Sequence, residues 1–154
     1  MSSSSKPDPR NPIHLLATGF GSGLSPWAPG TCGTLAALPL WWLLAHFLPL
    51  WGYVLATLCV MAIGPWLCGK TSHDMGVHDH GSIVWDEFAG LLITMIALPV
   101  SLSAAVLGFV AFRFFDILKP WPISWLDRNV EGGVGIMADD VLAGVFAAIC
   151  LQLL

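Results

Sequence analysis

The stretch FRFFDILKPWPISWLDRNVEGGVGIMADD, residues Phe112–Asp140, decides how the rest of the chain is interpreted. It holds half of the charged residues of a 154-residue chain in which only 10% of residues are charged and 56% are hydrophobic. Arg113, Asp116 and Lys119 follow one another at three-residue steps near the end of an apolar run, and two adjacent aspartates precede the next such run. We therefore expect the chemistry of this chain to lie in and around this stretch.

The composition predicts an integral membrane protein. A soluble domain usually has about a quarter of its residues charged, whereas this chain combines few charges with a mean hydropathy of +0.76. Such a chain cannot cover its surface with polar groups, so lipid must be the solvent for much of it. Eight tryptophans suit the two membrane interfaces, where amphipathic rings collect.

Several other classes of function are disfavoured by the same composition. The six Lys and Arg residues are scattered, so the basic stripe that a nucleic-acid partner requires is missing. The four cysteines have no CxxC spacing, and we assign them neither a disulfide nor a metal. His73, His78 and His80 cluster before the third apolar run; solvated or hydrogen-bonded histidines are favoured there over a transition-metal site.

Five apolar runs predict an all-α fold, a membrane-embedded helical bundle of about four to five short transmembrane or interfacial helices. The runs are Leu35–Leu50, Trp51–Cys68, Phe88–Leu98, Leu102–Leu118 and Val141–Leu154. Most are shorter than the ~20 residues that span a bilayer, so some helices should start or stop inside the interface. Residues 1–10 are Ser- and Pro-rich and predict a disordered polar tail. Residues 11–154 predict a single domain that opens with one short interfacial helix.

The distribution of charge predicts a topology. The connections Pro49–Gly52 and Pro99–Ser103 contain no charged residue, and all six basic residues lie in other segments. If five helices alternate in direction, every polar segment shares one face, which the positive-inside rule makes cytoplasmic. The alternative joins the third and fourth runs into one helix kinked at Pro99, which would move the later motifs to the opposite face. We favour the hairpin.

Two pairs of acids lie where polar segments meet apolar runs. Asp86 and Glu87 precede the third run, and Asp139 and Asp140 precede the fifth. Each pair taken alone is explained equally well by helix capping, because acids in a first turn meet the positive end of the helix dipole. Four carboxylates converging near lipid would repel one another unless cations neutralise them. Their hard oxygens suit Mg²⁺ or Mn²⁺ better than zinc, so we predict a divalent-metal site.

The basic residues of the opening stretch suggest a phosphate site. Arg113 and Asp116 lie on one helix face and can form an intrahelical ion pair, but that pair leaves Lys119 unexplained. Beside a metal, a guanidinium fork and an ammonium group would clamp a phosphate. The alternative for Lys119 is that it anchors a helix end by extending its ammonium group to the interface.

A glycine-rich segment, residues 18–34, precedes the first apolar run. No strand comes before it and it lacks GKS or GKT, so it is neither a Rossmann fingerprint nor a P-loop. Backbone N–H groups at Gly30 and the hydroxyls of Ser22 and Thr31 would suit an anion at a helix start. A tight turn at the membrane surface is the alternative, and spacing alone favours it.

Three blocks of the chain together resemble the phosphatidylglycerophosphatase A family. They are GFGSGLSPWAPGTCGTLAALP, GVHDHGSIVWDEFAGLLI and FRFFDILKPWPISWLDRNVEGGVGIMADDVLAG. The resemblance implies a Mg²⁺-dependent phosphatase of the bacterial inner membrane that converts phosphatidylglycerophosphate to phosphatidylglycerol in phospholipid biosynthesis. The family's segments fall on Asp79, Asp86 and Glu87, on Arg113, Asp116, Lys119 and Pro120, on Asp139 and Asp140, and on Pro29, Gly30 and Thr31.

The physical interpretation and the resemblance combine into one hypothesis. Asp86, Glu87, Asp139 and Asp140 hold Mg²⁺ and act in catalysis; Arg113 and Lys119 bind the phosphate together with Ser22, Gly30 and Thr31. Water is the nucleophile and a spare carboxylate, Asp116, orients it, with an aspartyl-phosphate intermediate as the alternative. Because these residues flank the apolar runs, the site should lie at headgroup depth on the cytoplasmic face.

The rival function is a small membrane transporter or channel with a polar cytoplasmic vestibule, because charges inside a membrane also mark transport paths. That function predicts polar residues at mid-helix depth, whereas here they flank the runs. Oligomeric state stays open. Ala143, Gly144 and Ala147 would permit close packing of the last helix against a neighbour in the same chain or in another.

Overall fold

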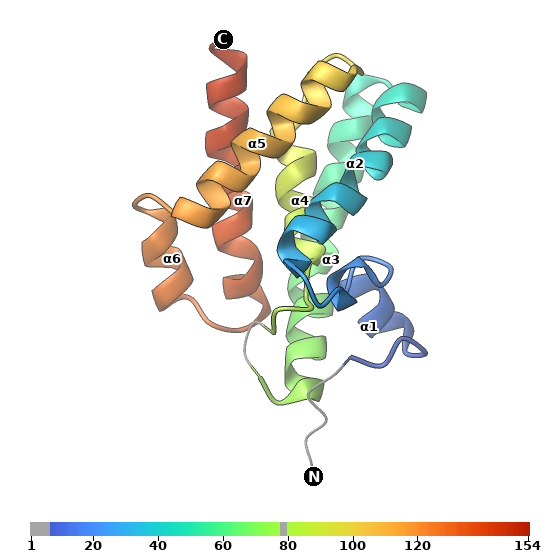
Figure 1. The fold of residues 1–154 in the computed structure, drawn as a ribbon, viewed down its shortest axis with the longest axis vertical. Coiled ribbons are helices and arrows are strands. Elements are labelled where there is room, and N and C mark those ends of the chain that lie inside the picture. Colours follow the sequence, from blue (N-terminus) through green and yellow to red (C-terminus); the bar gives the residue numbers. More distant parts are fainter. Residues whose placement is uncertain (1–6, 78–79) are drawn as a thin grey trace.

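The fold of the described part of the chain, residues 7–77 and 80–154 of a computed structural model, is entirely helical (Figure 1). The elements are α1 (Pro12–Ala17), the 3₁₀ turn η1 (Ser22–Leu24), α2 (Pro29–Phe47), α3 (Leu50–Met75), α4 (Trp85–Thr94), α5 (Leu102–Leu118), α6 (Ile123–Asn129) and α7 (Gly132–Gln152). The predicted tail falls largely on residues 1–6, outside the described residues.

The long helices alternate in direction, as the charge distribution predicts. The α2–α3 and α4–α5 connections lie together at one end of the long axis, the upper end in Figure 1, and the α3–α4 connection lies toward the other. The chain turns between the end of α4 at Thr94 and the start of α5 at Leu102, so the hairpin is confirmed and the single helix kinked at Pro99 is wrong. The polar segments therefore gather toward one end of the bundle.

Helix α4 is the centre of the bundle. All of its 10 residues are buried, and it packs against α2, α3, α5 and α7. Two of the surrounding helices, α3 and α7, are long and apolar enough to cross a membrane. The outer face of α5 carries Val106, Val110 and Phe114, each more than half exposed and spaced one turn apart. These apolar outer faces fit a helical bundle whose solvent is lipid.

Helix α2 starts earlier than the hydrophobic pattern predicts. It begins at Pro29, so the end of the glycine-rich segment is its first turn and not part of a surface loop. Proline at the first helical position removes an N–H that would have no partner there, and its fixed φ favours the helix. Helix α3 likewise continues past Cys68 to Met75, where Gly76 ends it in the left-handed conformation at φ 69°.

Helix α7 also starts before its apolar run, at Gly132. A Cβ on Gly133 would overlap the backbone of α3 at Pro65, so the glycines of this first turn allow two helices to touch directly. As a result Asp139 and Asp140 lie about two turns inside α7, and the helix-capping interpretation of this pair is wrong. The short helix α6, which precedes α7, is missing from the sequence-based prediction.

Candidate active site

The crossing of α4 and α7 builds the acidic centre. A Cβ on Gly144 of α7 would lie 2.5 Å from the carbonyl oxygen of Gly90 of α4, so the two helices meet backbone to backbone. Asp86 lies one turn before Gly90, and Asp140 lies one turn before Gly144. The small residues of the last helix thus pack against α4 of the same chain and place acids from both helices side by side.

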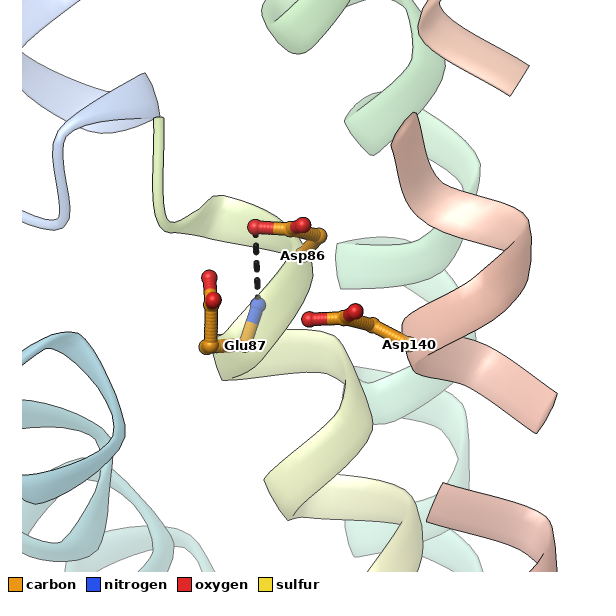
Figure 2. A group of neighbouring side chains, drawn as sticks. All are labelled: Asp86, Glu87 and Asp140. Atoms are coloured by element: carbon orange, nitrogen blue, oxygen red, sulfur yellow. Dashed lines mark hydrogen bonds between the residues drawn. The ribbon is translucent and has the colours of Figure 1, made fainter. Parts of the chain in front are cut away.

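Three carboxylates converge at this crossing. Figure 2 shows Asp86 and Glu87 from α4 and Asp140 from α7 turned toward one another. One oxygen from each lies within 4.8 Å of the others. The cluster is held locally by the backbone N–H of Glu87, which donates to Oδ1 of Asp86 at 3.1 Å. This spacing allows one small cation to contact all three side chains.

The same three side chains are nearly inaccessible. Asp86, Glu87 and Asp140 are 5%, 8% and 2% exposed. Among the described residues, Oε2 of Glu87 and Oδ2 of Asp140 have no hydrogen-bond partner. Buried polar oxygens without partners are energetically costly and rare. A hard divalent cation would satisfy them, so the donor set fits Mg²⁺.

The end of α5 adds the basic residues. Nη1 of Arg113 donates to Oδ2 of Asp116, so the predicted intrahelical ion pair forms. The same Nη1 lies 4.0 Å from Oε1 of Glu87, which joins the pair to the acidic cluster. The guanidinium therefore contacts acids on two helices, α4 and α5.

Lys119 links Asp116 to Asp139. Its Nζ lies 2.8 Å from Oδ2 of Asp139 and 3.4 Å from Oδ1 of Asp116, so the side chain points into the site and not out to the interface. Burial alone would lower the pKa of Lys119, but the hydrogen bond and charge of Asp139 and the charge of Asp116 outweigh burial and raise it. Lys119 therefore stays charged at physiological pH. Asp139 faces this lysine, whereas Asp140 faces the cluster of three.

These groups surround a cavity of about 260 Å³. Its lining includes the buried acids, Lys119, the start of α2 at Pro29 and Gly30, and the segment before α4 at His80 and Gly81. A larger cavity of about 490 Å³ lies near the α2–α3 and α4–α5 connections. Its lining contains no charged residue, and the hydroxyl of Tyr53 there already donates to the carbonyl oxygen of Leu92 at 2.6 Å. The smaller cavity is therefore the candidate active site.

The predicted anion-binding segment is only partly at the cavity. Gly30 is there: a Cβ on it would lie 3.1 Å from Oε1 of Glu87 and 3.3 Å from Nη1 of Arg113. Ser22 and Thr31 are not among the lining residues. The hydroxyl of Ser22 donates to the carbonyl oxygen of Gly19 at 2.9 Å, within its own turn. Substrate binding by Ser22 and Thr31 stays a prediction.

The structure adds one residue that the sequence motifs did not assign to the site. His80 lines the cavity, and its Nδ1 accepts from the backbone N–H of Ser82 at 3.0 Å. Its position in a polar segment just before Asp86 was the available signal. The side chain of His73 is 88% exposed at the end of α3, and His78 and Asp79 lie outside the described residues.

Comparisons with known proteins agree along nearly the whole chain. Residues 15–154 match the family described as Phosphatidylglycerophosphatase A. A phosphatidylglycerophosphatase A of Escherichia coli K12 is 59% identical over 139 residues, which cover 90% of this chain and 80% of the relative. One from Haemophilus influenzae is 53% identical over 140 residues, or 90% of this chain and 86% of the relative.

A more distant relative carries a different name. A protein of Bacteroides thetaiotaomicron, provisionally named a phosphatidylinositol-3-phosphatase, is 38% identical over 144 residues, which cover 89% of each chain. No solved structure matches the chain.

Proposed function

The chain belongs to the phosphatidylglycerophosphatase A family and is a phosphatase, and from this premise we propose that it hydrolyses the terminal phosphate of phosphatidylglycerophosphate in a Mg²⁺-dependent reaction. The product would be phosphatidylglycerol, made for phospholipid biosynthesis. One observation carries the proposal: three buried carboxylates within 4.8 Å of one another lie beside an arginine and a lysine.

Asp86, Glu87 and Asp140 are the residues that would hold Mg²⁺, with Asp139 next to them. When bound, the ion would polarise the phosphoryl group and neutralise the acids. The support is the pair of buried oxygens without a partner, Oε2 of Glu87 and Oδ2 of Asp140. The described side chains donate no hydrogen bond to these two oxygens, and a divalent cation would satisfy both.

Arg113 and Lys119 would take up the charge of the phosphoryl oxygens. Nε of Arg113 is buried without a partner among the described residues, so the guanidinium retains a donor beyond its bond to Asp116. Gly30 leaves room beside Arg113 at the start of α2, where backbone N–H groups favour an anion. Donors from α2 and α5 would thus bind the phosphate next to the acids.

Asp116 would orient the attacking water. Its two carboxylate oxygens accept from Arg113 and from Lys119, which fixes the orientation of the group. Each oxygen still has lone-pair capacity for a water molecule. The water oxygen then bonds to phosphorus while the bond from phosphorus to the glycerol oxygen breaks. The water gives up one proton and the glycerol oxygen takes up one, so the products are inorganic phosphate and a glycerol hydroxyl. Acid-quenched turnover with labelled lipid should leave no phosphate on the protein; a labelled aspartate would establish the covalent alternative.

The place of the site in the bundle suits a lipid substrate. The cavity is formed where α5 ends and where α2 and α4 begin, so a headgroup can reach it while the acyl chains stay beside the apolar helices. The absence of all six basic residues from the two uncharged connections supports a cytoplasmic orientation of the site in the bacterial inner membrane.

The test is release of inorganic phosphate by the purified protein in detergent. Phosphatidylglycerophosphate should be hydrolysed with Mg²⁺ and not with excess chelator. Phosphatidylinositol 3-phosphate, suggested by the name of the Bacteroides relative, serves as the competing substrate and should be hydrolysed more slowly. If a folded, lipid-supplied sample releases no phosphate, the proposal fails and a transporter or channel becomes the leading alternative.

A further inference from the structure

The cavity is rich in hydrogen-bond acceptors and poor in donors. Five of the side chains that line it are carboxylates: Asp86, Glu87, Asp116, Asp139 and Asp140. Among the described lining residues, only Lys119 and His80 carry side-chain N–H donors. Lys119 is already engaged by two aspartates. A phosphate group presents only acceptors when fully ionised, so it needs donors that the acids cannot give.

His80 is held in a defined orientation by its own segment. Its Nδ1 accepts from the backbone N–H of Ser82 at 3.0 Å, and its carbonyl oxygen accepts from the N–H of Ile83 at 2.9 Å. The N–H of Val84 donates to the carbonyl oxygen of Ala17 at 2.8 Å, which ties the segment to the end of α1. The imidazole is therefore positioned by backbone contacts that do not depend on a ligand.

The bond to Ser82 also decides which ring nitrogen can donate. A nitrogen that accepts from an N–H must keep its lone pair, so Nδ1 carries no hydrogen. The neutral ring then carries its hydrogen on Nε2. The geometry thus leaves Nε2 as the ring nitrogen that can donate.

We infer that His80 binds substrate by donating a hydrogen bond from Nε2 to a phosphoryl oxygen. This inference deepens the proposed function and rests on it. An imidazole held by Ser82 suits this place, because its second ring nitrogen is left to donate to the phosphate. It also explains why an imidazole stands beside a cavity whose acids are the ligands expected for a hard cation.

Two substitutions at His80 distinguish the loss of the Nε2 donor from the loss of the contact between Nδ1 and Ser82. In His80→Asn the amide oxygen can replace Nδ1 as the acceptor for Ser82, but no group reaches the position of Nε2. In His80→Gln the longer amide can place an N–H near that position. We expect His80→Asn to lower kcat/KM roughly ten- to one-hundred-fold, the range for a hydrogen bond to a charged group. His80→Gln should recover part of that loss.

The inhibition constant for inorganic phosphate, the reaction product, gives a second measurement. It should rise in His80→Asn by a factor similar to the fall in kcat/KM, while the thermal unfolding midpoint stays at the wild-type value. His73→Asn is the matched control, because that side chain is 88% exposed and does not line the cavity. It should behave as wild type in all three measurements.

The outcomes are distinct. Wild-type kcat/KM and phosphate inhibition in His80→Asn would overturn the inference while leaving the proposed function intact. A lowered unfolding midpoint in His80→Asn, with no recovery in His80→Gln, would overturn it in favour of a structural role. Absence of phosphate release by the wild-type protein would overturn the proposed function and this inference with it.

Discussion

Replacing Asp140 with asparagine removes a charge and keeps the shape of the side chain. One oxygen of Asp140 lies within 4.8 Å of those of Asp86 and Glu87. Two unit charges at that separation repel by about 3.5 kcal/mol at an effective dielectric constant of about 20. The substitution removes two of the three repulsive pairs, and nearby basic residues already offset part of that repulsion. We expect metal-free Asp140→Asn to be more stable than metal-free wild type by about 1–3 kcal/mol.

The same substitution should remove the response to metal. Thermal unfolding in detergent, with chelator and then with Mg²⁺, should show a rise of the wild-type midpoint that is absent or much smaller in Asp140→Asn, because ligand binding stabilises the folded state. Phosphate release by the variant should fall to background. Asp127→Asn is the matched control: Asp127 is exposed on α6 and does not line the cavity.

Two results would refute this reasoning. Turnover near the wild-type rate, or an unchanged stabilisation by Mg²⁺, would show that Asp140 is not a ligand. A metal-free variant that is less stable than wild type would show that repulsion among these carboxylates is smaller than the contacts that the substitution removes.

Three further substitutions test other parts of the site. Lys119→Met leaves Asp139 without its 2.8 Å partner and should lower the free energy of unfolding by about 2 kcal/mol and abolish turnover. Pairing raises the pKa of Lys119, so its contribution to the free energy of unfolding is complete below the unfolded-state pKa of about 10.4 and is lost only at higher pH. Denaturant unfolding should therefore give the same difference in free energy of unfolding between wild type and Lys119→Met at pH 6 and at pH 9. Gly144→Ala puts a Cβ 2.5 Å from the carbonyl oxygen of Gly90 and should destabilise by about 1–3 kcal/mol and reduce kcat, since α4 and α7 must separate; unchanged values would contradict the close crossing. The Cβ added by Gly30→Ala would meet only the ends of flexible side chains, so this variant should keep the wild-type unfolding midpoint and have a higher KM. A lowered midpoint would show that the start of α2 cannot adjust to the added Cβ.

The sequence predicted those parts of the fold whose signals are local. Helix α5 has the predicted bounds, Leu102–Leu118, because Ser101 caps its start by accepting from the N–H of Ala104 and Pro120 follows its end. The first turns of α7 could not be predicted in this way. GGVGIM has the composition of a loop, and it is helical because Gly133 packs against the backbone of α3, a contact between distant parts of the chain.

The candidate site was likewise predictable only where the signal is local in the sequence. The residue types were readable: acids for a metal, basic residues for a phosphate. Which acids meet was not readable, because Asp139 and Asp140 are neighbours in sequence but point to different partners once the helix forms. The sequence predicts that the hydroxyl of Ser22 faces an anion, but this hydroxyl donates to the carbonyl oxygen of Gly19, three residues earlier. His80 cannot be assigned to the site from the sequence, because a histidine in a polar loop has no periodic pattern to place it.

The crossing of α4 and α7 also sets when the enzyme can become active. Asp86 and Asp140 are 54 positions apart in the sequence, so α7 is synthesised after α4. At about 5–20 residues per second, the ribosome needs about 3–11 s to extend the chain from one residue to the other. During that interval Asp86 and Glu87 of α4 lack Asp140 of α7, and the cluster of three carboxylates cannot form. Under the proposed function, activity begins only after α7 has packed against α4, and a chain truncated before α7 is inactive.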